Sequence, residues 1–196
     1  GDKEAYNMST DIFVVDTPFL IAKLEEEAAK EEPRKLRYVL RDLAVAENAF
    51  AYEYTGYLSN IHSVKAYFDA NLDMLESHKF YKLFAPNQKV YTKVKNEEPT
   101  YYSDSSEVKL SQFASGSIVR GKVENSVISR NVDLSEGSSV SHSILFPRVK
   151  VAKGATVEYA IVDKGVEIAE GVTIRGTENN PVVIKKGSVV TEDIVR

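Results

Sequence analysis

The chain contains no cysteine, which excludes disulfides, thiolate nucleophiles and cysteine-ligated zinc, and which fits a reducing compartment. It also has no apolar run as long as a membrane span and no signal peptide. Lys and Arg (25) do not outnumber Asp and Glu (29), and the net charge of -4 predicts no general affinity for nucleic acid or acidic membranes. We therefore expect a cytoplasmic protein that binds neither.

What the sequence does have is a nine-residue pattern that repeats at a spacing of 17 residues. Three copies occupy residues 132–140, 149–157 and 166–174. A fourth copy, at 182–190, begins 16 instead of 17 residues after the third. Self-similarity at a fixed period is typical of a solenoid, in which each repeat stacks its apolar residues on the next.

The apolar positions of the copies superpose in columns. The columns are Val132, Val149, Val166 and Val182; Leu134, Val151, Ile168 and Ile184; and Val140, Val157, Ile174 and Val190. Apolar pairs between the copies, such as Ile144 and Leu145, supply a third side, and a glycine marks a turn in each copy. The pattern predicts a triangular parallel β-helix of hexapeptide repeats over residues 107–196. A β-sandwich is disfavoured because its strands would not superpose column by column.

The first part of the chain has a different pattern. Apolar residues 12–15 and alternating residues 50–54 indicate short strands. Helices are expected at 17–30, at 33–47 and after Ser63, and the run of Glu25, Glu26 and Glu27 is expected to be a solvated helix face.

Two strands are too few for an independent sheet core. Residues 1–80 are therefore predicted to be the C-terminal part of a larger α/β domain, joined by a linker at 81–106 to the β-helix. The start at Gly1 instead of Met also predicts a processed or truncated piece.

Three stretches resemble a known family. Residues 67–73 (Tyr-Phe-Asp-Ala-Asn-Leu-Asp) resemble the Tyr-Trp-x-Ala-Asn-x-Asp segment of bacterial glucose-1-phosphate adenylyltransferases, and residues 121–128 and 143–151 resemble the opening coils of their C-terminal domain. The resemblance implies a mainly β chain: a left-handed parallel β-helix preceded by an α/β remnant of a nucleotidyltransferase domain. It further implies a link to glycogen biosynthesis, where the family makes ADP-glucose and pyrophosphate from ATP and glucose-1-phosphate.

The chain departs from the family at the sugar-phosphate position. Catalytic members carry Trp-x-Asp-Val-Gly-Thr before the matching helix, and the Asp helps to hold Mg²⁺ and glucose-1-phosphate. Here Asn60 replaces that Asp, His62 replaces the Gly and Ser63 replaces the Thr. A neutral amide is a poorer Mg²⁺ ligand than a carboxylate. The glycine-rich phosphate loop of the family is also missing from the sequence.

With these substitutions, the chain resembles the non-catalytic, GlgD-type regulatory subunit of the family. The implied fragment has no catalytic residue, no metal site and no cofactor of its own, is inactive alone, and joins an Mg²⁺-dependent catalytic subunit in a heterotetramer. Because solenoid ends need caps or partners, we also expect the chain to self-associate, most simply as a dimer.

Other functions stay open. His142 lies on a coil, where a hexapeptide acyltransferase carries its general base, and the repeats could also be an oligomerisation module without a ligand. A β-helix carbonic anhydrase is rejected, since it needs three metal histidines and only one of the chain's three lies in the repeats. Arg148 and Lys150 are candidates for holding an anionic effector such as a sugar phosphate.

Overall fold

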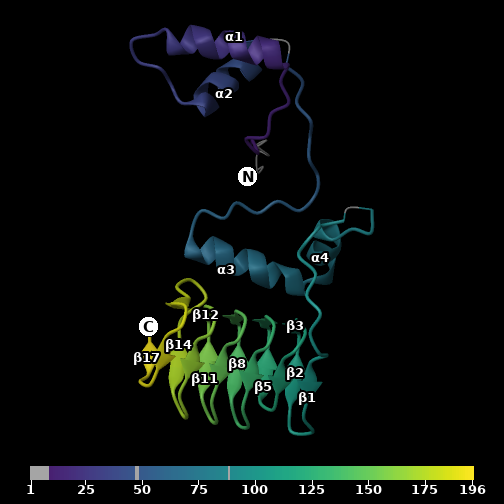
Figure 1. Cartoon of the computed structure of the whole chain (residues 1–196), viewed down its shortest axis with the longest axis vertical. Helices are drawn as coiled ribbons and strands as arrows, with labels where there is room; N and C mark the ends of the chain where they lie inside the picture. The colour runs from purple at the N-terminus through teal and green to yellow at the C-terminus, as the bar shows by residue number, and fades with distance from the viewer. Residues whose placement is uncertain (1–8, 47–48, 88) are drawn as a thin grey trace, which may run out of the picture. The chain divides into compact units, whose positions relative to one another are not determined.

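A computed structural model describes residues 9–46, 49–87 and 89–196. The chain divides into two compact units, Gly1–Thr55 and Gly56–Arg196, and each is considered by itself (Figure 1). No helix of the described residues is long and apolar enough to span a membrane.

The first unit is a pair of helices, α1 (Thr17–Ala28) and α2 (Leu36–Ala46). Asp16 caps α1, since its Oδ1 accepts the backbone N–H of Phe19 at 3.0 Å. The strands predicted at 12–15 and 50–54 do not form. A strand needs a neighbour for its backbone hydrogen bonds, and no strand of this unit is described beside them.

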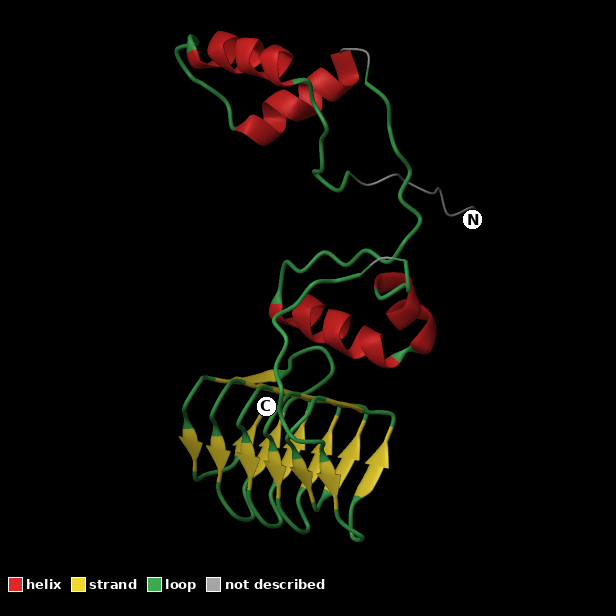
Figure 2. Ribbon diagram, turned by 45° about the vertical axis from the view of Figure 1, so that its right-hand side comes forward, coloured by secondary structure: helices red, strands yellow, loops and turns green. Residues whose placement is uncertain are grey.

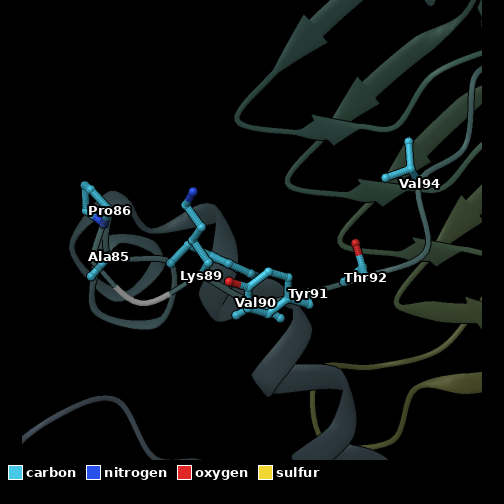
Figure 3. Close-up of a pocket in the computed structure, with 8 residues that line it drawn as sticks. Ala85, Pro86, Lys89, Val90, Tyr91, Thr92 and Val94 are labelled. Carbon is cyan, nitrogen blue, oxygen red and sulfur yellow. The ribbon is translucent and has the colours of Figure 1, made fainter.

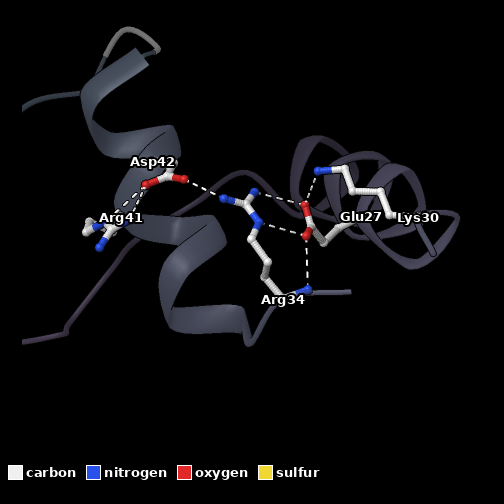
Figure 4. Close-up of polar contacts among 5 residues, drawn as sticks. All are labelled: Glu27, Lys30, Arg34, Arg41 and Asp42. Carbon is white, nitrogen blue, oxygen red and sulfur yellow. Dashed lines mark hydrogen bonds and ion pairs between the residues drawn. The ribbon is translucent and has the colours of Figure 1, made fainter. Parts of the chain in front are cut away.

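Glu27 corrects the prediction of a solvated acidic face. Its side chain is buried, and its carboxylate accepts Arg34 Nε at 2.8 Å, the second guanidinium arm at 2.9 Å and the Arg34 backbone N–H at 3.0 Å. Lys30 also donates to it, and Arg34 reaches on to Asp42 at 2.6 Å (Figure 4). Glu27 is thus tolerated in the interior because its oxygens are fully paired.

This pairing predicts a pH dependence. The hydrogen bonds from Arg34, followed by those from Lys30, hold the pKa of Glu27 far below its ordinary value. A depressed pKa contributes stability that is complete above the ordinary carboxyl pKa of about 4.3 and is lost as the pH falls toward the folded-state value. In Arg34→Gln, the pKa of Glu27, measured by carbon-13 NMR, should rise toward the ordinary value. Arg37→Gln, whose guanidinium bonds to Tyr38 instead, should leave it in place, and an equal response would contradict the assignment.

The second unit is a triangular β-helix whose strands all pair in parallel (Figure 2). Side 1 contains β1 (Tyr101–Tyr102), β4 (Ile118–Val119), β7 (Asp133–Leu134), β10 (Lys150–Val151), β13 (Glu167–Ile168) and β16 (Val189–Val190). Side 2 contains β2 (Glu107–Lys109), β5 (Lys122–Glu124), β8 (Ser139–Ser141), β11 (Thr156–Glu158), β14 (Thr173–Arg175) and β17 (Ile194–Val195). Side 3 contains β3 (Gln112–Phe113), β6 (Val127–Ile128), β9 (Ile144–Leu145), β12 (Ala160–Val162) and β15 (Val182–Ile184). The predicted parallel β-helix is confirmed, and it begins at Tyr101, within the stretch predicted as linker.

The interior columns of the first three copies are confirmed. Val151 pairs with Leu134 and Ile168, and Val157 pairs with Val140 and Ile174. All of these side chains are buried in one continuous core. Stacking of like residues from coil to coil therefore builds the core, as the period predicts.

The fourth copy was assigned to the wrong sides. Val182 pairs with Ala160 and Ile184 with Val162, so both lie on side 3, while Val190 lies on side 1 beside Ile168. The cause is a loop at 176–181, which replaces the single residue Tyr159 that joins sides 2 and 3 one coil earlier. All three sides share the same apolar spacing, so the pattern does not identify which side a copy occupies.

A ladder of serines lines the edge between sides 2 and 3. Ser111 Oγ accepts the backbone N–H of Ser126, Ser126 Oγ that of Ser143, and Ser143 Oγ that of Ala160, each at 3.1 Å. Each hydroxyl also donates to the carbonyl two residues before it. The buried Ser126 and Ser143 are thus fully satisfied and tie successive coils together.

Helix α3 (Val64–Leu72) packs on the outside of side 3. It begins at Ser63, whose Oγ accepts the Ala66 N–H at 3.1 Å, as predicted, and it continues into a 3₁₀ turn, η1 (Asp73–Leu75), and into α4 (Ser77–Leu83), which was not predicted. Phe68 is 1% exposed and packs against Ile144 and Ile161. Residues 56–80 therefore share a unit with the β-helix, whereas the predicted division grouped them with residues 1–55.

Candidate functional site

The residues predicted to form a degenerate sugar-phosphate position lie on an exposed turn before α3. Asn60, His62 and Ser63 are all exposed. The His62 backbone N–H and the His62 Nδ1 both lie close to the Asn60 carbonyl oxygen, at 3.1 and 3.0 Å, and the Ser63 hydroxyl is used as the helix cap. The described residues hold no group of three or more His, Cys, Asp or Glu that suits a metal ion.

A polar cluster that was not predicted joins Tyr57, which precedes this turn, to Asp73 in η1 and Lys79 in α4. The Tyr57 hydroxyl donates to Asp73 Oδ2 at 2.9 Å, and Lys79 donates to Asp73 Oδ1 at 2.6 Å and to Glu76 at 2.8 Å. Burial, followed by the hydrogen bond to Asp73, raises the pKa of Tyr57. Hydrogen bonds to Asp73 and Glu76 raise the pKa of Lys79. The only signal for this cluster in the sequence is that Asp73 ends the motif at 67–73.

Arg148 and Lys150, the two candidates for holding an anionic effector, are two residues apart in the sequence but differ in their contacts. Lys150 lies on β10 and pairs with Glu167 on β13, with 2.7 Å between Nζ and Oε1, and this contact raises its pKa. Arg148 lies at the corner before β10, is exposed, and has no carboxylate partner in the described chain. The structure therefore does not bring the two side chains together around one empty position.

His142 lies in the packing of the edge between sides 2 and 3. Its ring stacks on Tyr159, with ring centroids 4.8 Å apart, and its Nε2 lies 3.3 Å from the Asn125 side-chain nitrogen. Its Nδ1 is buried and has no hydrogen-bond partner. A general base must reach a substrate proton, and a half-buried ring that stacks on Tyr159 and contacts Asn125 does not favour the acyltransferase alternative.

The segment after α4 forms a shallow open groove (Figure 3). Its lining includes Phe84, Pro86, Lys89, Val90 and Tyr91, which are close in sequence. The described residues of the lining include no carboxylate or imidazole.

Comparison with known proteins agrees with the hexapeptide β-helix of the second unit. Residues 96–195 match the family model described as GlmU-like, C-terminal hexapeptide. The glycogen biosynthesis protein GlgD of Bacillus subtilis is 40% identical over 141 residues, which are 72% of this chain and 41% of that protein. The GlgD protein of Geobacillus stearothermophilus is 53% identical over 127 residues, 65% of this chain and 37% of that protein.

More distant relatives carry the name of the enzyme itself. A glucose-1-phosphate adenylyltransferase of Mycoplasma mobile is 31% identical over 105 residues, 54% of this chain and 27% of that protein. The chain spans 41% or less of the length of these three relatives. The predicted resemblance is thus confirmed, and the chain belongs to the family of GlmU-like C-terminal hexapeptide proteins, with the GlgD glycogen biosynthesis proteins among its close homologues.

Proposed function

We propose that this chain is part of a regulatory, non-catalytic subunit of glucose-1-phosphate adenylyltransferase that acts in glycogen biosynthesis in the cytoplasm. The observation that carries the proposal is the 53% identity over 127 residues to a GlgD protein. The β-helix of this chain would serve assembly and regulation, and the adenylyl transfer would take place in the partner.

The exposed turn at Asn60 supports a role without catalysis. An amide oxygen and an imidazole do not fit Mg²⁺, a hard cation that prefers carboxylate and phosphate oxygens. Asn60 and His62 are also exposed, so no water-excluding cavity strengthens electrostatic interactions there. In this proposal Mg²⁺ belongs to the catalytic partner.

A silent subunit acts on its partner only through differential binding. It must bind one conformation of the catalytic subunit more tightly than another, and the shift in the partner's equilibrium cannot exceed that difference. The stacked coils, whose strands pair in register on each side, offer an extended surface for such binding. We propose a heterotetramer with the catalytic subunit, and self-association of this chain, as a dimer, when the partner is absent.

The test is co-expression of this chain with the glucose-1-phosphate adenylyltransferase catalytic subunit encoded in the same genome. The expected result is co-elution on a sizing column, with a changed kcat or KM of the catalytic subunit at saturating chain. A chain with Val149→Asp, which places a carboxylate in the coil core, is the control and should elute separately. Separate elution of the unmodified chain, with unchanged kinetics, would overturn the proposal. Co-elution with unchanged kinetics would identify an oligomerisation module instead.

A further inference from the structure

One edge of the β-helix carries basic side chains on three successive coils, with Lys164 and Lys186 at equivalent positions and Arg148 one position further along its own coil. At the corner between sides 3 and 1, Arg148, Lys164 and Lys186 lie on three successive coils and are exposed; we call these three residues the basic edge. Backbone hydrogen bonds stack this corner from coil to coil, from the Gly165 N–H to the Pro147 oxygen at 3.0 Å and from the Gly187 N–H to the Lys164 oxygen at 2.9 Å. With coils about 4.8 Å apart, the three residues span about 10 Å.

The charges of the basic edge are not neutralised. Several other outward cations of the β-helix pair with a carboxylate on a neighbouring coil. These pairs are Lys109–Glu124, Arg120–Asp133, Lys122–Glu107, Lys150–Glu167 and Arg175–Glu158. Arg148, Lys164 and Lys186 have no such partner among the described residues. Asp163, beside Lys164, instead accepts the Lys164 backbone N–H at 2.7 Å. The corner is therefore locally positive, although the whole chain has a net charge of -4.

Arg148 also occupies a strained backbone position. Its φ is 63°, whereas the equivalent corner positions of the next two coils are Gly165 and Gly187, with φ of 64° and 69°. Only glycine adopts this left-handed region without steric cost. Asn131, at the same corner one coil earlier, has a φ of 56°, so the left-handed conformation is a property of the corner, and what distinguishes Arg148 there is its unpaired charge.

We propose that the basic edge is a docking surface for an acidic polypeptide segment of a partner protein. Carboxylates three or four residues apart on a helix are about 5–6 Å apart, close to the rise from one coil to the next. A single phosphate group is too small to contact all three cations at once. This inference is independent of the proposed function, because it rests only on the unpaired charges of the corner.

The test uses the full chain and two labelled helical peptides of 15 residues, one with glutamates four apart on one face and one with glutamines at the same positions. Fluorescence anisotropy at low salt should show binding of the glutamate peptide only. The double variant Lys164→Gln and Lys186→Gln should bind it about tenfold more weakly, as expected for the loss of two charge contacts. The matched control is the double variant Lys153→Gln and Lys93→Gln, which should bind as the unmodified chain does. Both lysines are exposed, lie away from the basic edge and have no ion pair among the described residues.

Arg148→Gly separates docking from folding. Glycine relieves the strained corner, so the variant should melt at an equal or higher temperature while binding the glutamate peptide more weakly. Equal losses in the edge variant and the control would reveal general electrostatic attraction and overturn the proposal. The proposal also fails if the glutamine peptide binds as tightly, if Arg148→Gly leaves binding unchanged, or if millimolar inorganic phosphate displaces the peptide completely at constant ionic strength.

Discussion

Val149→Asp is expected to lower the melting midpoint of the β-helix by a large amount. Val149 is fully buried, at 0% exposed, in the core shared by successive coils. Its carbonyl oxygen accepts the Asp133 N–H at 3.0 Å, so its backbone is also fixed in the ladder. A carboxylate at this position would be buried without a partner, at a cost of about 3–5 kcal/mol. That is a large part of the total stability of a domain, about 5–15 kcal/mol.

The matched control is Val195→Asp. Val195 is 61% exposed and pairs with Arg175 on the neighbouring strand, so the same substitution there places a carboxylate in water beside a cation. Far-UV circular dichroism should show a much lower midpoint for Val149→Asp and a nearly unchanged midpoint for Val195→Asp. If both variants melt like the unmodified chain, the assignment of the inward column is wrong.

Phe68→Ala is expected to release α3 from the β-helix without unfolding the coils. Phe68 is the largest of the fully buried side chains and the one residue of α3 that is fully buried. Removal of a buried phenyl ring costs about 3–5 kcal/mol. The coils have their own core, which does not include Phe68. The loss should therefore be local, because stability in a protein is distributed over units that open separately.

Amide hydrogen exchange is the measurement for this prediction. Protection should fall through α3 in Phe68→Ala and should be kept at the buried amides of the coils. Val64→Ala, on the same helix but with Val64 50% exposed, is the control and should keep protection in α3. Loss of protection throughout the coils in Phe68→Ala would show that α3 and the coils unfold as one unit.

The coils were predictable from the sequence because the period of the apolar residues is the length of one coil. Leu134, Val151 and Ile168 recur at a fixed spacing because each side chain packs on the one in the coil before it. The same regularity misled the assignment of Val182 and Ile184 to side 1. A repeat whose three sides share one spacing predicts that a residue points inward, but a loop of unusual length decides which side it occupies.

Contacts between residues far apart in the sequence were harder to predict than features set by adjacent residues. Glu27 lies in a run of glutamates, and only the position of Arg34 after the turn explains its burial. Likewise, the apolar residues at 12–15 have strand character, but a strand forms only beside a partner. The capping of α3 by Ser63 depends on a few adjacent residues and was predicted correctly.

The degenerate site at Asn60 and His62 stays a prediction, because the structure shows their exposure and not their function. Asn60 and His62 were found by their departure from a motif, and the structure places both on an exposed turn. The difference between Arg148 and Lys150 was not predictable, because the sequence does not say that Lys150 faces Glu167 across neighbouring coils. The backbone conformation of Arg148 becomes visible only when its corner is aligned with Gly165 and Gly187.

The loop at 176–181 offers a place for a reporter. Strand pairing resumes in register on both sides of it, with β12 against β15 and β14 against β17, so stacking, not the length of the connection, sets the register. Gly176 must stay, since a Cβ there would lie 2.5 Å from the Tyr159 oxygen. Glu178 and Asn179 are exposed. A fluorophore or affinity tag inserted between them would follow the assembly of this chain from a corner that extends into solvent.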